Sequence, residues 1–230
     1  MRKKRKLWYW LLVRIPFWFV VLSIALVFLF KWVPVRYTPL MLKRSIQNAK
    51  TANYDTRRHW KPLEEISPEM VKAVIISEDS MFDVHHGFDW DQMRTMWKDY
   101  REKGKELRGC STISQQTAKN VFTFGTHTWV RKGLEGYWTI LIEAIWGKRR
   151  IMEVYLNVIE TGPGLYGVEA AARKYYHCHA AALDRFQAAY IAVCLPRPLV
   201  YSPVNPSNYI QRRQRTVRLR IKRMPDPEWL

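Results

Sequence analysis

The N-terminal end places the strongest constraint on what this chain can fold into. Residues 1–6 carry five Lys or Arg side chains, and residues 15–30 then run for sixteen positions without a charge. Adding residues 7–13 lengthens the apolar stretch to 24 residues, interrupted only by Arg14. A helix that crosses the hydrocarbon core of a bilayer needs about 20 apolar residues. The pattern therefore predicts one transmembrane helix over residues 7–33.

A cleaved signal peptide is the alternative for this segment. Its apolar core is usually shorter, about 7–15 residues, and a cleavage site of small residues follows it. Here the run ends in FKWVP at residues 30–34, which offers no such site. An uncleaved signal-anchor is therefore favoured. Because Lys and Arg gather on the cytoplasmic side of a membrane helix, we expect residues 1–6 in the cytoplasm and everything beyond about residue 34 outside it.

Composition narrows the class of protein further. The 230 residues hold 38 Lys and Arg against 20 Asp and Glu, a formal net charge of +18, and 48% are hydrophobic. This composition excludes a disordered chain and a coiled coil, and the single long apolar stretch excludes a multi-span transporter. The charge fits nucleic acid, anionic lipid or a phosphate-bearing substrate. Three cysteines are too few for a disulfide framework, and whether Cys178 and Cys194 pair stays open.

Beyond the membrane segment the sequence favours helices. Residues 34–60 are expected to form an extended linker, and residues 61–230 a single domain. The triplet Ser67-Pro68-Glu69 is typical of a helix start, with an N-cap hydroxyl, a proline in the first turn and an acid beside it. Further helices are expected over 112–122, 129–146, 149–156, 168–176, 180–194 and 208–223. No alternating run indicates a large sheet, so the predicted fold class is mainly α.

Glu78 and Asp79 form the first candidate site. The helix that starts after Ser67 carries apolar side chains at helical spacing and brings Glu78 to its C-terminal end. A carboxyl group at a helix end beside apolar residues is where a pKa can rise toward the working range of a general base. The alternative is a solvated acidic pair at a helix terminus, and this segment alone does not exclude it.

Residues 109–120, GCSTISQQTAKN, form a second candidate site. A glycine leads into hydroxyl groups at a helix start, followed by two amides and a Lys-Asn pair. Such a run can offer backbone N–H groups, hydroxyls, amides and a cation to a polar, anionic ligand. An ordinary capped helix with a polar face has the same pattern, so both interpretations stay open.

Two further blocks carry charge. Arg131, Lys132 and Glu135 lie within about one helical turn, and a local ion pair is the alternative to a functional role. Residues 148–157, KRRIMEVYLN, combine a basic helix start with an apolar face that favours packing. The six histidines show no HExxH or similar spacing, so a zinc site is not expected.

Together these blocks resemble the peptidoglycan glycosyltransferases of glycosyltransferase family 51. Five motifs match in order: EDSMFDVHHG (78–87), GCSTISQQTAKN (109–120), RKGLE (131–135), KRRIMEVYLN (148–157) and GPGLYGVEAAARKYY (162–176). Slight departures are Cys110 and Ser114, where the family often has a small residue and Thr. The Ser-x-x-Lys and Lys-Thr-Gly elements of a transpeptidase do not occur in these residues, and the chain is short, which favours the monofunctional form.

The resemblance implies a lysozyme-like helical head with a small membrane-facing jaw, expected within residues 90–130, where residues 121–124 and Trp129 would dip into the membrane interface. It implies polymerisation of lipid II into β-1,4-linked glycan strands, with inversion and release of polyprenyl pyrophosphate. Glu78 matches the family's general base. Glu135 matches its second catalytic carboxylate, whose implied role is positioning or the binding of pyrophosphate and a metal ion. The implied substrate-binding residues are Asp79, Ser111, Thr112, Gln115, Gln116, Lys119, Asn120 and Arg131.

The same resemblance sets expectations for cofactors, partners and location. A divalent cation, Mg²⁺ or Mn²⁺, is compatible with it, with Glu135 as the candidate contact, and no organic cofactor is expected. The expected partners are lipid II, the growing lipid-linked glycan, the membrane and proteins of cell-wall synthesis, with no nucleic acid. The expected location is the bacterial inner membrane, crossed once, with the N-terminus in the cytoplasm and the catalytic domain in the periplasm.

Three other functions stay open. A lytic transglycosylase shares a lysozyme-like architecture and a catalytic Glu, but it has no need of the Gln-Gln-x-x-Lys-Asn block. A membrane-anchored scaffold would leave Glu78 and Glu135 merely structural. A nucleic-acid binder would use the seven cations of residues 211–223, but the expected location outside the cytoplasm argues against it.

Overall fold

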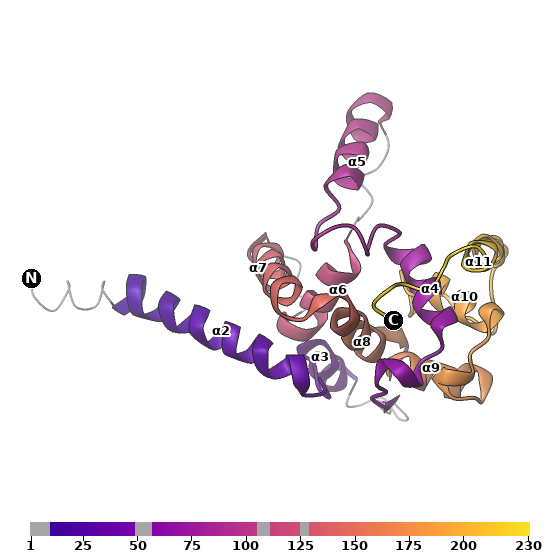
Figure 1. Ribbon diagram of the computed structural model, residues 1–230, viewed down its shortest axis with the longest axis horizontal. Coiled ribbons are helices and arrows are strands. Elements are labelled where there is room, and N and C mark those ends of the chain that lie inside the picture. The colour runs from indigo at the N-terminus through magenta and orange to yellow at the C-terminus, as the bar shows by residue number, and fades with distance from the viewer. Residues whose placement is uncertain (1–9, 49–56, 105–110, 125–128) are drawn as a thin grey trace, which may run out of the picture.

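A computed structural model describes residues 10–48, 57–104, 111–124 and 129–230. A long N-terminal helix extends away from a cluster of shorter helices (Figure 1), and the predicted mainly-α fold class is confirmed. The basic tail at 1–6, Gly109 and Cys110 lie outside the described residues. The main helices are α2 (Ile15–Trp32), α3 (Pro39–Gln47), α4 (Pro68–Glu78), α5 (Trp90–Lys103), α6 (Ile113–Phe122), α7 (Trp129–Ile145), α8 (Gly147–Val158), α9 (Val168–Tyr176), α10 (Arg185–Cys194) and α11 (Asn208–Ile221).

The remaining elements are short. A π-helical turn, Trp10–Arg14, precedes α2, and two 3₁₀ turns, Leu63–Glu65 and Ala180–Ala182, precede α4 and α10. The strands β1 (Arg57–Arg58), β2 (Glu160–Gly162) and β3 (Leu165–Tyr166) form one small sheet in the order β1-β3-β2, with β1 parallel and β2 antiparallel to β3.

Helix α2 is the predicted membrane span. Residues Leu12–Trp32 form a stretch of 21 residues with mean hydropathy 2.4, which is long and apolar enough to cross a membrane. Most of its side chains are exposed, as a helix surrounded by lipid requires. Three sets of hydrogen bonds join one side of it to the body formed by the other helices: Ser23 with the Tyr137 hydroxyl, Trp146 Nε1 with the Val27 carbonyl, and Arg150 with the Phe30 and Val33 carbonyls.

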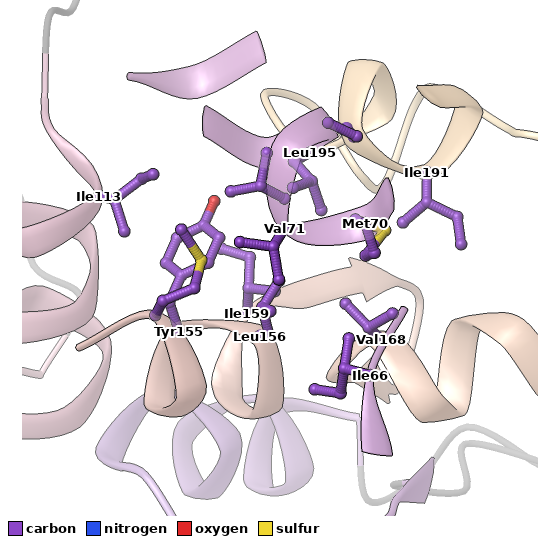
Figure 2. Packing of buried hydrophobic residues seen from close by; sticks show 14 of the residues in the cluster. Ile66, Met70, Val71, Ile113, Tyr155, Leu156, Ile159, Val168, Ile191 and Leu195 are labelled. Carbon is purple, nitrogen blue, oxygen red and sulfur yellow. The ribbon is translucent and has the colours of Figure 1, made fainter. Parts of the chain in front are cut away.

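One hydrophobic cluster fills the body and fixes α4 at its centre. Figure 2 shows Met70 and Val71 of α4 together with Tyr155 and Leu156 of α8 and Ile191 of α10. All five side chains are buried, and burial of a large apolar side chain contributes about 1.5–3 kcal/mol. The helix that ends at the candidate carboxylate is therefore firmly held.

Two predictions about the approach to α4 are wrong. The range 34–60 is not extended throughout, because it contains α3, whose N-cap Thr38 accepts a hydrogen bond from Met41 N at 3.2 Å. Met41 is buried, so this helix packs onto the body. Ser67 precedes α4 but does not cap it with its side chain, because its hydroxyl donates to the Leu183 carbonyl at 2.7 Å.

The region expected to form the jaw contains α5, which projects from the other helices (Figure 1) and buries none of its side chains. The prediction that residues 121–124 dip into the membrane interface is wrong for the first three of them. Val121 and Thr123 are buried, and the Phe122 ring stacks on Trp138 with ring centroids 4.3 Å apart. Phe124 and Trp129 are exposed, Trp129 to 92%.

The other helix predictions agree with the structure to within a few residues, with one interruption. The predicted helix over 180–194 is divided, because Asp184 caps α10 by accepting a hydrogen bond from Gln187 N at 2.8 Å. An acidic N-cap with Gln three positions later is a capping box, and this signal marks a new helix start within the predicted range.

Candidate active site

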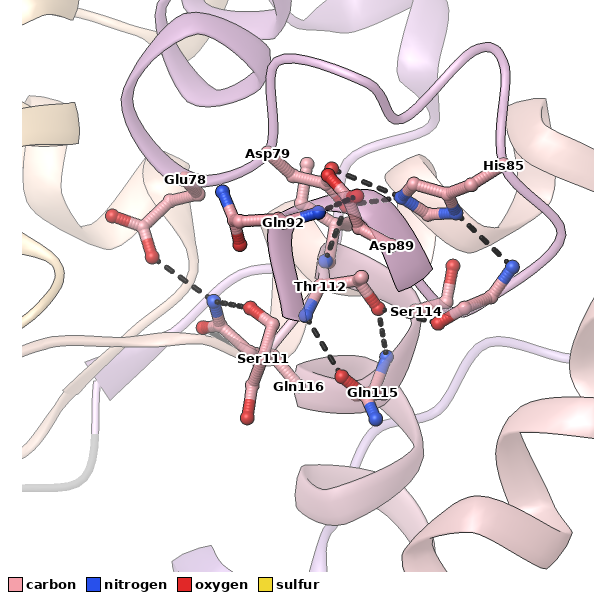
Figure 3. Close-up of polar contacts among 12 residues, drawn as sticks. Glu78, Asp79, His85, Asp89, Gln92, Ser111, Thr112, Ser114, Gln115 and Gln116 are labelled. Carbon is pink, nitrogen blue, oxygen red and sulfur yellow. Dashed lines mark hydrogen bonds and ion pairs between the residues drawn. The ribbon is translucent and has the colours of Figure 1, made fainter. Parts of the chain in front are cut away.

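Glu78 is the last residue of α4, and its carboxylate faces α6 (Figure 3). One oxygen, Oε2, accepts a hydrogen bond from Gln116 Nε2 at 3.0 Å. The other oxygen, Oε1, is buried and has no hydrogen-bond partner in the described part of the chain. The predicted place of Glu78 at a helix end is confirmed. Its unpartnered oxygen can accept a proton from a bound ligand.

The surroundings of Glu78 raise its pKa above the ordinary value for glutamate. Burial is the largest cause, because desolvation disfavours the charged carboxylate. The hydrogen bond from Gln116 and the positive charges of Arg213 and Lys119 act in the opposite direction, while the charge of Asp79 adds to the rise. A carboxyl group with a raised pKa is better matched to general-base work near neutral pH than an exposed glutamate.

Asp79 holds the loop of residues 79–89 rather than facing the same space as Glu78. Both of its carboxylate oxygens lie 2.9 Å from His85 Nε2, and Oδ2 also accepts from Ile113 N at 2.9 Å. Gly87 N donates to His85 Nδ1 at 3.1 Å, so Nδ1 carries no proton and Nε2 is the donor to Asp79. Asp79 thereby ties loop 79–89 to the start of α6.

Thr112 and Gln115 cap α6. Thr112 Oγ1 accepts from Gln115 N at 3.1 Å, and Gln115 Oε1 accepts from Thr112 N at 3.0 Å, which is a capping box. The Thr112 hydroxyl also donates to the Gly87 carbonyl at 2.7 Å. Both side chains are buried. The capped-helix interpretation therefore holds for these two residues, and their contacts lend no support to the prediction that they bind substrate.

The two adjacent glutamines have separate partners. Gln115 faces the cap, whereas Gln116 faces Glu78 and accepts a hydrogen bond at Oε1 from the Tyr155 hydroxyl at 3.4 Å. Tyr155 is fully buried, and burial followed by the charges of Glu78 and Asp79 raises its pKa well above the ordinary value. Tyr155 is therefore a neutral donor, and it orients the Gln116 amide so that Nε2 points at Glu78.

Glu135 lies on α7 and is clamped by two cations from its own helix. Arg131 Nη1 lies 2.6 Å from Oε2, and Lys132 Nζ bonds to Oε1. The Glu135 side chain is only 2% exposed. The local ion-pair interpretation is confirmed, and both carboxylate oxygens are engaged. This carboxylate holds positive charge in place and has no unpartnered oxygen comparable to that of Glu78.

Lys119 lies on α6 within electrostatic reach of both carboxylates. Burial is the largest influence on its pKa and lowers it, Glu135 opposes this, and Arg131 and Lys132 reinforce it, with a smaller rise from Glu78. Three cations therefore gather beside Glu135 on two packed helices. Such a cluster can bind and neutralise a polyphosphate.

The remaining predicted residues take ordinary positions near this centre. Asn120 is buried on α6, and Ser111 precedes the helix, with its carbonyl 3.4 Å from Gln116 Nε2. Helix α6 packs against α7 and is hydrogen-bonded through Gln116 to Glu78 at the end of α4, which brings the two predicted carboxylates toward one region.

Three residues in or beside the site were not predicted individually. Lys148 Nζ donates to the His85 carbonyl at 2.6 Å and to Glu143 Oε1 at 2.8 Å, which braces loop 79–89 from α8. Lys148 and Tyr155 both lie in the block 148–157, so the motif was the available signal for them. Arg213 lies on α11, far along the chain from Glu78, and no local pattern connects the two.

The residues that the structure describes do not fit a protein-held metal ion. No group of three or more His, Cys, Asp or Glu side chains gathers within them. Glu135, the predicted contact, has Arg131 and Lys132 on its two oxygens, and these two cations repel a metal ion. Cys178 and Cys194 are both free, so no disulfide joins them.

Comparisons with known proteins match most of the chain. A family model described as Transglycosylase matches residues 44–223. A biosynthetic peptidoglycan transglycosylase of Bdellovibrio bacteriovorus is 50% identical over 204 residues, which are 88% of this chain and 81% of that protein. Proteins of the same name from Rhodospirillum centenum and Bacteroides thetaiotaomicron are 47% and 46% identical, over 87% and 86% of this chain and 85% and 80% of their own lengths.

Proposed function

Since this chain belongs to the transglycosylase family, we propose that Glu78 is the general base of its glycosyl transfer and that Glu135 organises the cations for the leaving group. The protein is a peptidoglycan glycosyltransferase. It polymerises glycan strands in cell-wall synthesis and acts on lipid II and glycan strands at the membrane.

In the proposed reaction the sugar 4-hydroxyl of one lipid II attacks the anomeric carbon of the lipid-linked growing chain. A hydroxyl group is a weak nucleophile, so its proton leaves as the new C–O bond forms. Glu78 accepts this proton at Oε1, the buried oxygen that has no hydrogen-bond partner in the described ranges, while Gln116 holds Oε2. Attack on the face opposite the leaving group inverts the anomeric centre and gives a β-1,4 linkage.

The bond from the anomeric carbon to pyrophosphate breaks, and its electron pair goes to the pyrophosphate oxygen. Pyrophosphate needs charge neutralisation rather than a strong acid. In the proposal Lys119 and Arg131 supply this charge, and Glu135 keeps Arg131 and Lys132 oriented toward the ligand. The buried position of Glu135 between the two cations supports this role.

The other predicted substrate contacts divide into two groups. Ser111, Gln116 and Asn120 stay proposed substrate contacts. Asp79, Thr112 and Gln115 are proposed to act as positioning residues, because their polar atoms hold loop 79–89 and the start of α6.

A divalent cation stays a proposal, as an ion bound by the pyrophosphate of the substrate rather than by side chains of the protein. Mg²⁺ or Mn²⁺ would add charge neutralisation at pyrophosphate oxygens. Among the residues that the structure describes, no group of carboxylates and histidines fits such an ion, and Glu135 is engaged by Arg131 and Lys132.

We further propose that α2 anchors the enzyme in the bacterial inner membrane, with the N-terminus in the cytoplasm and the catalytic body in the periplasm. The length and hydropathy of Leu12–Trp32 and the basic residues before it support this orientation. The anchor keeps the site beside a substrate that cannot leave the bilayer. Other proteins of cell-wall synthesis stay proposed partners.

The observation that carries the base assignment is the buried Oε1 of Glu78, which none of the described residues hydrogen-bonds. The test is polymerisation of fluorescent lipid II by the full chain and by Glu78→Gln, with Glu102→Gln as a matched change on the exposed face of α5. We expect glycan ladders from the wild type and from Glu102→Gln and none from Glu78→Gln. Full activity in a folded Glu78→Gln would refute the assignment. Release of soluble fragments from purified sacculi, without polymer from lipid II, would instead indicate a lytic enzyme.

A further inference from the structure

The last seven residues of the chain fold back onto the catalytic body. Residues 224–230, MPDPEWL, leave α11 and return across α4 to end beside α8 (Figure 1). They lie beyond residue 223, where the family match ends. We call this segment the C-terminal strap. Its two prolines fix φ near about −65°, which restricts the free segment and reduces the entropy lost when it docks.

Two contacts attach the strap to separate helices. Asp226 Oδ1 pairs with the ammonium of Lys72 on α4 at 2.9 Å, and Lys72 is buried. Arg149 of α8 donates from Nη1 to the Trp229 carbonyl at 3.1 Å and to the Leu230 carbonyl at 2.7 Å. The strap therefore bridges the helix that carries Glu78 and the start of α8.

Trp229 connects the strap to loop 79–89. Its indole Nε1 donates to Asp83 Oδ1 at 2.7 Å. Its ring meets the Phe82 ring edge to face, with ring centroids 5.9 Å apart and planes 81° apart. Such aromatic pairs are favourable beyond the area that they bury. Phe82 is fully buried, so Trp229 covers an apolar anchor of the loop.

Phe82 in turn connects with the polar side of the same loop. Its backbone N–H donates to the Asp79 carbonyl at 3.1 Å. Its ring contacts the His85 ring and lies under the Lys148 ammonium, which is 4.6 Å from the ring centroid. Asp79 and His85 hold the polar side of the loop, whereas Phe82 and Trp229 hold its apolar side.

We propose that the C-terminal strap positions loop 79–89 for catalysis. Trp229 is the positioning residue in this proposal. It keeps Asp79 aligned with α6, and thereby also the end of α4 at Glu78. Trp229 acts through Phe82 and Asp83 and touches no group of the proposed reaction. The inference rests on the proposed role of Glu78 as the base.

A strap of this kind affects turnover rather than substrate affinity. The cations proposed to bind pyrophosphate lie on α6 and α7, whereas the hydrogen bonds and the ion pair of the strap named above go to α4, α8 and loop 79–89. Loss of the Trp229 contacts leaves the loop held on its polar side alone. The aligned arrangement of Glu78 is then populated less often, which lowers kcat and leaves KM nearly unchanged.

The test uses full-length Trp229→Ala, Trp229→Phe and the control Glu228→Ala, a change to the exposed neighbour within the strap. We expect kcat for lipid II polymerisation to fall about tenfold in Trp229→Ala with KM within about twofold. Trp229→Phe retains the ring contact and is expected to lose less. Hydrogen exchange is expected to rise in loop 79–89 of Trp229→Ala and to stay unchanged in α10.

Asp83 provides a second pair of variants that does not depend on the indole ring. Asp83→Asn keeps an oxygen acceptor for Trp229 Nε1, whereas Asp83→Ala removes it, so only the alanine variant is expected to lose kcat. An unchanged kcat in both Trp229→Ala and Asp83→Ala would overturn the proposal, as would increased exchange throughout the body. If these variants are fully active while Glu78→Gln is inactive, only the proposed role of the strap is refuted. If Glu78→Gln is active, the base assignment itself is refuted.

Discussion

Glu78 and Glu135 are the same type of side chain, both are largely withdrawn from water, and their surroundings are opposite. Glu78 ends α4 and meets an amide on one oxygen, and its other oxygen has no hydrogen-bond partner among the residues that the structure describes. Glu135 sits within α7 and meets Arg131 on one oxygen and Lys132 on the other. The first carboxylate is disfavoured in its charged form, and the second is held by two positive charges.

The difference shows that the surroundings, rather than the residue type, assign the two roles. A carboxylate that gains little from its neighbours can take up a proton, and one that is clamped by cations can organise them. Enzymes that use two carboxylates commonly separate them in this way. The contrast also predicts that equal substitutions at the two positions will have different effects on activity and on stability.

The largest expected effect is on activity at Glu78. Glu78→Gln removes the proton acceptor while keeping the size and the partner of the side chain, so the polymerisation rate is expected to fall about 10²–10⁴-fold. Glu78→Asp keeps a carboxylate but withdraws it by one methylene group, and we expect a smaller loss. Initial rates with fluorescent lipid II measure both. A Glu78→Gln rate that equals or exceeds the rate of Glu78→Asp, with both variants clearly active, would show that the carboxylate itself is unimportant.

Glu135→Gln is expected to affect stability as well as activity. The change leaves Arg131 and Lys132 without their carboxylate, and Arg131 is mostly buried. Breaking a fully buried pair costs about 3–5 kcal/mol, and we expect about 1–3 kcal/mol here because Lys132 is half exposed. Urea unfolding of the detergent-solubilised protein measures this loss. A variant as stable as the wild type would contradict the clamp.

The adjacent glutamines sharpen the comparison further. Gln116→Leu removes the donor to Glu78, and since that bond lowers the Glu78 pKa, the pKa rises and the acid limb of the pH–rate profile moves to higher pH. We expect the rate near neutral pH to fall about tenfold, as the loss of a hydrogen bond to a charged group predicts.

Gln115→Leu is the matched control for that change. It breaks the capping box of α6 and is expected to cost about 1 kcal/mol of stability, with the acid limb unmoved. An equal shift of the acid limb in both glutamine variants would show that the effect does not act through Glu78.

The smallest expected effect is a gain in stability in Glu78→Gln. The folded-state pKa of Glu78 lies above its ordinary value. The protonated group therefore contributes fully to the free energy of unfolding of the wild type at low pH, and this contribution is lost as pH rises through the folded-state pKa. The neutral glutamine avoids that loss. We expect the variant to be on the order of 1 kcal/mol more stable at pH 7 and no more stable below the ordinary glutamate pKa. Thermal unfolding at both pH values measures this difference, and a less stable variant at pH 7 would contradict it.

Much of the fold could be predicted because its signals are local. The end of α4 at Glu78 and the start of α6 after Thr112 follow from apolar spacing and cap residues. The membrane span follows from the length of the apolar run. The hydroxyl of Ser67 was misassigned because its partner, the Leu183 carbonyl, lies 116 positions away.

The same distinction between local signals and long-range contacts applies to the candidate site. The five motifs supplied Glu78, Gln116, Lys119 and Glu135, but the pattern did not separate Gln115 from Gln116. Capping by Gln115 is visible only once the helix start is placed, and the orientation of Gln116 depends on Tyr155 from another helix. The hydrogen bond from Trp229 to Asp83 joins residues 146 positions apart, and Phe82 is the neighbour of Asp83, so no local pattern indicates these strap contacts.

The pH dependence of polymerisation by the wild type and by Glu78→Gln tests the account most directly. For the wild type, we predict a rate that falls with decreasing pH as a group with a pKa above the ordinary glutamate value takes up a proton. For Glu78→Gln, we predict a low residual rate without that acid limb. The same acid limb in Glu78→Gln would show that another group is the base, and the separation of roles between Glu78 and Glu135 would then be wrong.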